Sequence, residues 1–249
     1  TNHKAQSSKL KVQSKKNQSK KAMPERKLYD TLLGLPLFLG MTRGDLLDIA
    51  GKTKFYFQKL KKGHVIAQEG DPCLHIHFLI SGEIKVTTES EDHGYRIEET
   101  ITAPSVLQIE RFFGFNQHYT HTFTAGQDCN VMSFSRKELT ILSDNYEIFR
   151  INQLNILSTQ TQRCEQRLFC LPPKTLEESI LQFFERRCLR PSGEKIIHIK
   201  MTRLAEEINT KRIYISNTLN EMEAKGLIKL YRGIVVIPDL EMLISKIRN

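Results

Sequence analysis

Two short apolar stripes at helical spacing lie close together between residues 201 and 224. Their members repeat every three or four residues, as on one face of a helix: Leu204, Ala205 and Ile208, then Ile215, Leu219 and Met222. The connection, residues 209–211, is too short for anything but a sharp corner, and Asn209 suits the left-handed conformation that such a corner needs. The pattern therefore predicts two helices that cross closely at a tight turn.

The second of these helices carries a mostly polar face opposite its apolar stripe. The face is made by positions i, i+1, i+4, i+5 and i+8: Arg212, Ile213, Ser216, Asn217 and Asn220. Such a helix can enter the major groove of DNA. A helix stop at Lys225-Gly226 and two β-rich runs, residues 227–230 and 234–237, follow it. We therefore predict a winged helix-turn-helix in a DNA-binding domain over residues 174–249; a purely structural αα-hairpin is the alternative.

Short alternating strands predominate between residues 28 and 135. Glycine-containing turns separate them, at Lys62-Gly63, Glu69-Gly70-Asp71-Pro72 and Ser81-Gly82-Glu83. Between two of these turns Ile76, Phe78 and Ile80 alternate with other residues along one strand. Regular short strands of this kind predict a β jelly roll over residues 28–135, entered through helical segments near residues 32–35 and 45–52.

A long helical stretch follows, residues 136–171, and Pro172-Pro173 ends it. A heptad-like seam runs along this stretch in steps of three and four residues: Leu154, Leu157, Thr161, Cys164, Leu168 and Leu171. We predict a dimerisation helix over residues 136–173, because one helix-turn-helix rarely binds DNA tightly alone. The alternative is a single amphipathic helix that lies on the chain's own β-domain.

The positive charge of the chain is concentrated in a tail. The net charge is +9, and residues 1–27 supply +8 through eight Lys and one Arg against Glu25. Residues 28–173 carry −3 and residues 174–249 carry +4, a modest surplus suited to phosphates. The tail has too few apolar residues to fold, so we predict a basic disordered segment over residues 1–27. The change of composition at Met23-Pro24 leaves open whether the protein starts at Met23.

Other features of the sequence narrow the class of protein. No apolar run reaches membrane-spanning length, and the tail lacks the apolar segment of a signal peptide. Five cysteines without a CxxC pair suit a reducing compartment, so we expect a cytoplasmic protein with no membrane partner. The chain has no phosphate loop, nucleophile elbow, HExxH or paired-carboxylate motif. We therefore expect no enzyme and assign no catalytic residue.

Two sequence motifs follow each other along the chain: LKKGHVIAQEGDP at residues 60–72 with FLISGEIKV at 78–86, and then LAEEINTKRIYISNTLNEMEAKGLI at 204–228. In this order they resemble the signatures of the Crp/Fnr family of bacterial transcription regulators. The resemblance implies an α+β chain with a cyclic-nucleotide-binding-like jelly roll, a dimerisation helix and a winged helix-turn-helix. It also implies a homodimeric, sequence-specific regulator on a pseudo-palindromic operator, with RNA polymerase as a further partner.

We expect nine residues to contact DNA. They lie on the two crossing helices and in the wing: Thr202, Lys211, Arg212, Ile213, Tyr214, Ser216, Asn217, Asn220 and Arg232. The family usually has a glutamate just after Arg212 and a second arginine five residues on, where this chain has Ile213 and Asn217. Arginine pairs with guanine, asparagine suits adenine, and isoleucine can only touch the thymine methyl. We expect a half-site that is richer in A·T pairs.

The larger departure from the family is in the nucleotide-binding cassette, residues 106–126. Cyclic-nucleotide-binding members carry Gly-Glu for the ribose and Arg-Ser for the phosphate, where this chain has Leu107-Gln108 and Tyr119-Thr120. A cyclic phosphate needs a cation and free backbone N–H groups, and Arg111 is the only cation nearby. We expect a degenerate pocket of these five residues that does not bind cyclic AMP in the usual mode, and the effector stays unidentified.

Cysteine and histidine residues leave a metal or haem site open. Cys73, His75 and His77 alternate along one strand, and His118 and His121 lie in the cassette. Solvated histidines on an outward strand face are commoner, so we assign no metal ligand and no cofactor. The alternative function is a cupin-like metal-binding or ligand-binding jelly-roll protein. However, His75-Ile76-His77 supplies only the first part of the cupin ligand pattern.

Overall fold

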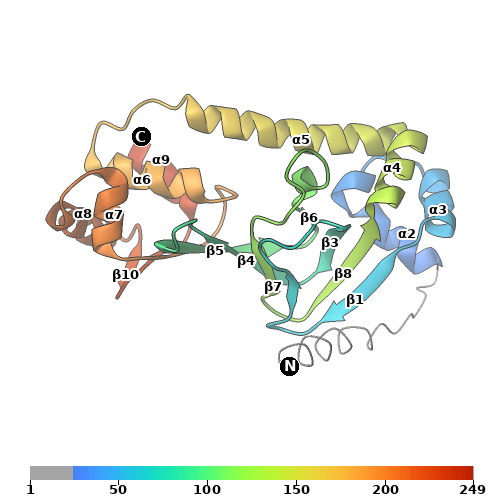
Figure 1. Cartoon of the computed structure of the whole chain (residues 1–249), viewed down its shortest axis with the longest axis horizontal. Helices are drawn as coiled ribbons and strands as arrows, with labels where there is room; N and C mark the ends of the chain where they lie inside the picture. Colours follow the sequence, from blue (N-terminus) through green and yellow to red (C-terminus); the bar gives the residue numbers. More distant parts are fainter. Residues whose placement is uncertain (1–24, 249) are drawn as a thin grey trace, which may run out of the picture.

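The computed structural model describes residues 25–248 and shows two domains with a long helix beside them (Figure 1). Residues 1–24 of the predicted tail lie outside the described residues, and residues 25–27 begin helix α2 (Glu25–Leu33). We call residues 25–135 the β-domain and residues 176–248 the C-terminal domain. No helix in the described part of the chain is long and apolar enough to cross a membrane.

The β-domain is a pair of packed antiparallel sheets, as the predicted jelly roll requires. Helices α2, η1 (Pro36–Phe38) and α3 (Arg43–Lys52) precede the strands. The strands are β1 (Tyr56–Leu60), β2 (Val65–Ala67), β3 (His75–Ser81), β4 (Glu83–Glu89), β5 (Tyr95–Thr102), β6 (Ser105–Leu107), β7 (Thr122–Ala125) and β8 (Cys129–Ser135), with η2 (Ile109–Arg111) after β6. One sheet has the order β1-β8-β3-β6, and the facing strands run β5-β4-β7-β2.

The turn between β3 and β4 shows why glycine is needed there. Gly82 has a φ of +93°, and a Cβ atom on it would lie 2.7 Å from the Cβ atom of Cys129. Any other side chain would clash with β8 at this point, and the left-handed conformation itself favours glycine. The glycine therefore allows β4 to leave the first sheet and join the second.

Four phenylalanines form the centre of the β-domain core. Phe78 and Phe134 stack with ring centroids 5.3 Å apart, and Phe38 meets Phe149 edge-on at 5.2 Å. All four side chains are fully buried. Since Phe149 belongs to the long helix, its ring anchors that helix on the β-domain.

The single helix predicted over residues 136–171 is wrong, because the structure contains two helices there. Helix α4 (Arg136–Asn145) ends at Tyr146, which has an extended conformation, and α5 (Glu147–Leu168) begins after it. The Tyr146 hydroxyl donates a 2.5 Å hydrogen bond to Asp48 of α3, which holds the break in place. The break redirects the chain so that Phe149 enters the core. Helix α5 also ends before Leu171, so that residue lies outside the helix.

The C-terminal domain has the predicted crossing helices and wing. Its elements are α6 (Leu176–Arg187), β9 (Lys195–Ile199), α7 (Met201–Ile208), α8 (Arg212–Ala224), β10 (Lys229–Tyr231), β11 (Ile234–Ile237) and α9 (Leu240–Arg248). Asn209 adopts the expected left-handed conformation, with φ 55° and ψ 54°, and the Thr210 amide donates to the Ala205 carbonyl at 2.9 Å. The residues of both apolar stripes are buried, except that Ile208 is partly exposed. Strand β9 and helix α9 are not predicted by the sequence patterns described above.

A continuous sheet joins the two domains. Strand β9 pairs with β11 of the wing on one side and with β5 of the β-domain on the other, which gives the order β10-β11-β9-β5-β4-β7-β2. Figure 1 shows β5 extending from the β-domain toward the C-terminal domain. Helix α5 connects the domains as well, because Arg167 near its end donates to the Cys188 carbonyl at 2.7 Å. The domains are thus held together at two separate places.

Removal of the Phe149 ring tests the anchor of α5. Phe149→Ala should lower the free energy of unfolding by about 3–5 kcal/mol, because it leaves a cavity among fully buried rings. The neighbouring Ile148 is 40% exposed, so Ile148→Ala should lower it by less than about 1 kcal/mol. Denaturant unfolding followed by circular dichroism measures both changes, and equal effects of the two variants would contradict this packing.

Candidate DNA-binding surface and effector pocket

Helix α8 presents an uncovered polar face. Its apolar residues Ile215, Leu219 and Met222 are fully buried against the rest of the C-terminal domain, so the opposite face turns outward. Ile213 is 59% exposed and Tyr214 is 53% exposed. The remaining predicted contacts on α7, α8 and the wing are also exposed, with only Ser216 partly buried: Thr202, Lys211, Arg212, Asn217, Asn220 and Arg232. The structure therefore brings the predicted DNA-contact residues to the surface.

The polar side chains of this face have no partners within the part of the chain that the structure describes. Among the residues that the structure describes, the side chains of Arg212, Asn217 and Asn220 make no hydrogen bond or ion pair, and neither does that of Lys211 at the helix N-cap. Unpaired donors and the positive end of the helix dipole suit a polyanion. Arginine and asparagine can form bidentate hydrogen bonds with base edges in a major groove.

The wing adds a second exposed segment to this surface. Its strands β10 and β11 pair from Lys229↔Val236 to Tyr231↔Ile234. The connecting turn carries the predicted contact Arg232 and a glycine, Gly233, with a φ of +73°. Tyr231 beside it is 59% exposed and is not among the contacts predicted from the sequence. An exposed aromatic residue next to an arginine was the signal that could have identified it.

The structure brings together the two halves of the predicted effector pocket, and they bind each other. Gln108 has a left-handed conformation with φ 41°. Its Nε2 atom donates to Thr120 Oγ1 at 2.6 Å, and the Thr120 amide donates to Gln108 Oε1 at 3.2 Å. One of the backbone N–H groups that could hold an anion is therefore already satisfied. Leu107 beside Gln108 is 2% exposed and adds an apolar wall.

The other two predicted pocket residues have different environments. Tyr119 is 4% exposed, and its hydroxyl donates to the His75 carbonyl at 3.0 Å. Burial raises the pKa of this hydroxyl above its usual value, so Tyr119 stays neutral. Arg111 is partly buried, and within the described residues its Nε atom is buried without a hydrogen-bond partner. Arg111 is thus the one predicted pocket residue that keeps an unsatisfied cationic donor.

Each histidine in this region has a protein environment of its own. His77 Nδ1 lies 3.0 Å from the Tyr119 hydroxyl, and burial lowers the pKa of His77 to about 4, helped by nearby His75. His121 Nδ1 is hydrogen-bonded to Thr88 Oγ1 at 2.9 Å, and burial lowers its pKa to about 4 as well, with the charge of Arg111 contributing. His118 lies in the exposed loop beside Asn116. Among residues 25–248, no group of three or more His, Cys, Asp or Glu side chains is placed to hold a metal ion.

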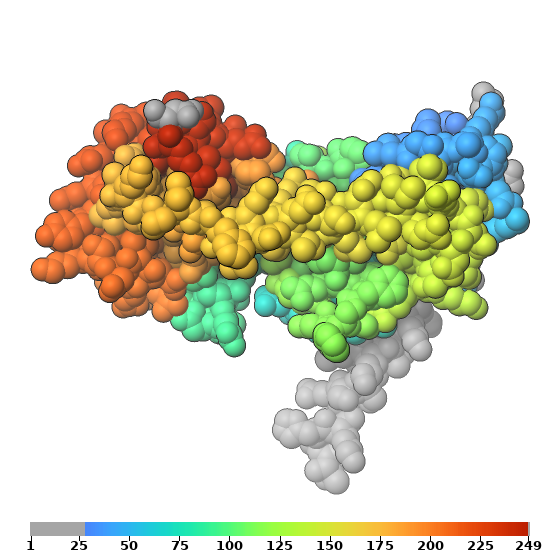
Figure 2. Space-filling model, turned by 90° about the horizontal axis from the view of Figure 1, so that it is seen from above, coloured from blue at the N-terminus to red at the C-terminus, as the bar shows by residue number. Residues whose placement is uncertain are grey.

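Helix α5 (Glu147–Leu168) runs along one face of the molecule from the β-domain toward the C-terminal domain, with one side uncovered (Figure 2). Of the predicted seam, Leu154 is 55% exposed, Leu168 is 76% exposed, and Thr161 and Cys164 are also exposed. Leu157 departs from this pattern, because it packs partly against the core of the β-domain. Ile151, 42% exposed and one turn before Leu154, extends the apolar side instead. The exposed apolar stripe of α5 therefore includes Ile151 and lacks Leu157, so it lies slightly around the helix from the predicted seam.

Comparison with known proteins places these features in a family. A family model described as a cyclic nucleotide-binding domain matches residues 57–146, and one described as a Crp-like helix-turn-helix domain matches residues 178–245. The CRP-like cAMP-activated global transcriptional regulator of Mycobacterium tuberculosis is 24% identical over 194 residues. This alignment covers 75% of the present chain and 86% of that protein.

Solved structures with similar folds include the catabolite activator protein of Thermus thermophilus, with 17% identity and a TM-score of 0.44. It matches 84% of the present chain and 97% of its own chain. A Crp/Fnr-family regulator from Eubacterium rectale has 19% identity and a TM-score of 0.49, with 86% and 99% of the two chains covered. The two family models match in the same order as the two domains, and the curated relative is a transcriptional regulator rather than an enzyme. The chain therefore belongs to the Crp/Fnr family of transcription regulators.

Proposed function

We propose that the chain is a homodimeric, sequence-specific DNA-binding regulator that reads a pseudo-palindromic operator through α8. The observation that carries this proposal is the uncovered face of α8, where Arg212, Asn217 and Asn220 are exposed and unpaired within the described residues. Side chains in this state lose no protein contacts when they bind bases, so their interactions with DNA are fully available. Such a regulator acts where the DNA is, in the cytoplasm, and RNA polymerase is its natural further partner.

The base preference follows from the three residues at the start of the reading face. Arg212 at the first turn of α8 can bind guanine through two hydrogen bonds, and Asn217 can bind adenine in the same way. Ile213, exposed between them, offers only apolar contact with a thymine methyl group. We therefore propose a half-site with one guanine and an A·T-rich remainder.

The proposed dimer forms along the uncovered stripe of α5. Ile151, Leu154 and Leu168 lie on the side of the helix that faces away from the β-domain, and large apolar side chains at this exposure suit a partner surface. A two-fold pair of helices places two copies of α8 on one duplex, with half-sites about 34 Å apart. We keep residues 136–173 as the proposed dimerisation segment and residues 28–135 as the proposed sensor domain.

The proposed effector differs from cyclic AMP, although the mycobacterial relative is described as cAMP-activated. In the present chain Gln108 and Thr120 satisfy each other where a nucleotide would need ribose and phosphate partners. A ligand in this place would have to displace two hydrogen bonds before it made its own. The effector acts, in this proposal, by changing the spacing of the two recognition helices.

Substitution of Arg212 tests the reading face directly. Arg212→Ala should weaken binding to a selected operator by about 1–3 kcal/mol and relax the preference at one base position, because a bidentate contact with guanine is lost. Lys211→Ala is the matched control and should weaken binding to all duplexes alike through one phosphate contact. Fluorescence anisotropy with native and single-base-changed duplexes measures both. An unchanged operator affinity in Arg212→Ala would show that this register is wrong.

Titration calorimetry with cyclic AMP tests the effector assignment. The chain lacks the usual glutamate and arginine, each of which contributes about 1.5–3 kcal/mol as a charge-assisted hydrogen bond. We therefore expect no binding heat at micromolar concentrations of cyclic AMP. A micromolar dissociation constant would contradict the closed Gln108–Thr120 pair described above.

A charge placed in the uncovered stripe tests the dimer. Leu154→Lys should dissociate it, because the two-fold axis brings the two new charges close together in an apolar seam. Met242→Lys on α9 is the control, since Met242 is 54% exposed, as Leu154 is at 55%, but lies off the stripe. Sedimentation velocity measures the mass of each variant. A Leu154→Lys protein that is still dimeric would place the interface on another surface.

A further inference from the structure

The hairpin formed by β4 and β5 reaches out of the β-domain and becomes part of the C-terminal domain. Strand β5 pairs with β9 over five residues, from Tyr95↔Ile199 to Glu99↔Lys195. Ile97 of β5 is 1% exposed and belongs to the same hydrophobic core as Ile197, Leu204 and Leu219. A residue of one domain thus completes the core of the other, so the two cannot separate without exposing it.

A buried ion pair lies at the base of this junction. Lys195 Nζ is 2.9 Å from Glu99 Oε1, and the two side chains are only 1% and 3% exposed. Lys195 also donates to the Ser192 carbonyl at 2.8 Å, while Glu99 accepts the amide of Leu189 at 2.7 Å. Both charges therefore have partners, and loss of either residue would leave the other charge buried and unpaired. Such a pair favours one relative position of the two strands.

A second set of contacts lies at the tip of the hairpin, and we call it the hairpin clasp. Asp92 pairs with Arg203 of α7 at 2.7 Å, Arg203 pairs with Glu207 at 2.6 Å, and Glu207 pairs with Arg187 of α6 at 2.6 Å. Arg187 Nε then donates to the Tyr95 hydroxyl at 2.7 Å, which returns the chain of contacts to the hairpin. The clasp is the set of these five residues: Asp92, Tyr95, Arg187, Arg203 and Glu207.

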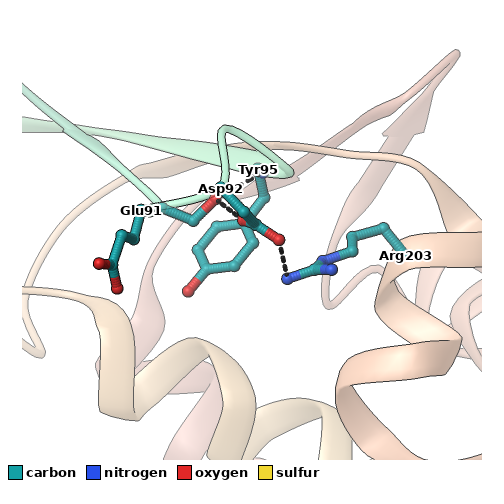
Figure 3. Close-up of a pocket in the computed structure, with 5 residues that line it drawn as sticks. Glu91, Asp92, Tyr95 and Arg203 are labelled. Carbon is teal, nitrogen blue, oxygen red and sulfur yellow. Dashed lines mark hydrogen bonds and ion pairs between the residues drawn. The ribbon is translucent and has the colours of Figure 1, made fainter.

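Figure 3 shows the tip of the hairpin facing α7 across a shallow pocket of about 400 Å³. Asp92 and Arg203 meet at one side of this pocket, and the ring of Tyr95 lies beside them, on the side of Glu91. Gly94 explains the close approach, because a Cβ atom on it would lie 2.9 Å from Arg203 Nε. The sequence of the hairpin is thus suited to bring its backbone against an arginine of the DNA-binding domain.

The junction contacts the C-terminal domain away from the exposed residues of α8 that we propose to read DNA. Its contacts involve α6, α7 and β9, whereas the exposed residues Ile213 and Tyr214 of α8 stay uncovered. A contact that blocked DNA binding by masking would cover that reading face. This junction leaves the exposed face of α8 uncovered and fixes the direction of that face relative to α5 and the β-domain.

The junction also lies next to the cassette. Strand β4 pairs with β5 on one side and with β7 on the other, and β7 begins two residues after Thr120. His121 in this short connection is hydrogen-bonded to Thr88 of β4. Only β4 separates the cassette strand from the strand that holds the C-terminal domain.

We propose that the hairpin clasp and the Glu99–Lys195 pair position the recognition helix for its operator, so that their members are positioning residues for DNA reading. This inference rests on the proposed function. The hairpin holds each C-terminal domain in the orientation in which both copies of α8 reach their half-sites. A chain with a loosened junction populates that orientation less, and its apparent operator affinity falls by the same fraction.

Two variants with side chains of similar size test the positioning role. Glu207→Gln removes the shared charge at the centre of the clasp. The double variant Glu99→Gln, Lys195→Met removes the buried ion pair without leaving a lone charge. Glu185→Gln is the control, because it breaks the Arg248–Glu185 pair inside the C-terminal domain. The probes are a duplex that the native protein enriches from a random pool and an unrelated duplex of equal length. Hydrogen exchange at the β9 amides is measured on each protein.

Both test variants should bind the enriched duplex about tenfold more weakly than the native protein, with faster exchange in β9. Binding to the unrelated duplex should change less than about twofold, because phosphate contacts do not depend on the spacing of the two helices. The control should match the native protein.

Two results would overturn the inference. Tighter binding of the enriched duplex would show that the junction inhibits DNA binding, and unchanged binding with faster exchange of the β9 amides would show that its role is only structural. If the double variant does not fold, Glu207→Gln alone decides. If the native protein enriches no duplex, the proposed function itself fails.

Discussion

Backbone pairing between β5 and β9 is the constraint on which the rest of the structure depends. A sheet that runs through both domains couples their positions through backbone hydrogen bonds and packed side chains. The buried Glu99–Lys195 pair strengthens the constraint, because a slip in register would leave charges without partners. Helix α5 then adds a second connection, from Phe149 in the first core to Arg167 against the C-terminal domain. The direction of α8 follows from these contacts.

The polar groups of the cassette and those of α8 differ in whether they have partners. In the cassette, Gln108 and Thr120 satisfy each other, and burial keeps His77 and His121 neutral at physiological pH. On α8 the polar side chains are exposed and lack partners among the described residues. Paired groups in the cassette must break existing hydrogen bonds before they can bind a polar ligand, whereas the unpaired groups on α8 are free to bind one. This contrast supports the proposal of a DNA-binding regulator whose effector differs from cyclic AMP.

Local patterns in the sequence were sufficient to predict much of the fold and the exposed face of α8. The stripes around Leu204 and Ile215 and the left-handed Asn209 predicted the crossing helices, and alternation around Ile76 and Phe78 predicted the β-domain. The break between α4 and α5 at Tyr146 was not predicted. The contact that holds it is a hydrogen bond from Tyr146 to Asp48, a residue distant in the sequence, and local patterns do not report such contacts. Strand β9 had a visible signal in its isoleucines, 196, 197 and 199. Its pairing with β5 had none, since pairing partners far apart in sequence leave no periodicity to read.

The most direct measurement is an experimental structure of the protein bound to a duplex that it has selected from a random pool. The account predicts a two-fold dimer with each Arg212 in a major groove, half-sites about 34 Å apart, and the β5–β9 register from Tyr95↔Ile199 to Glu99↔Lys195 intact. A complex in which β9 has left β5, or in which α8 does not contact base edges, would contradict it.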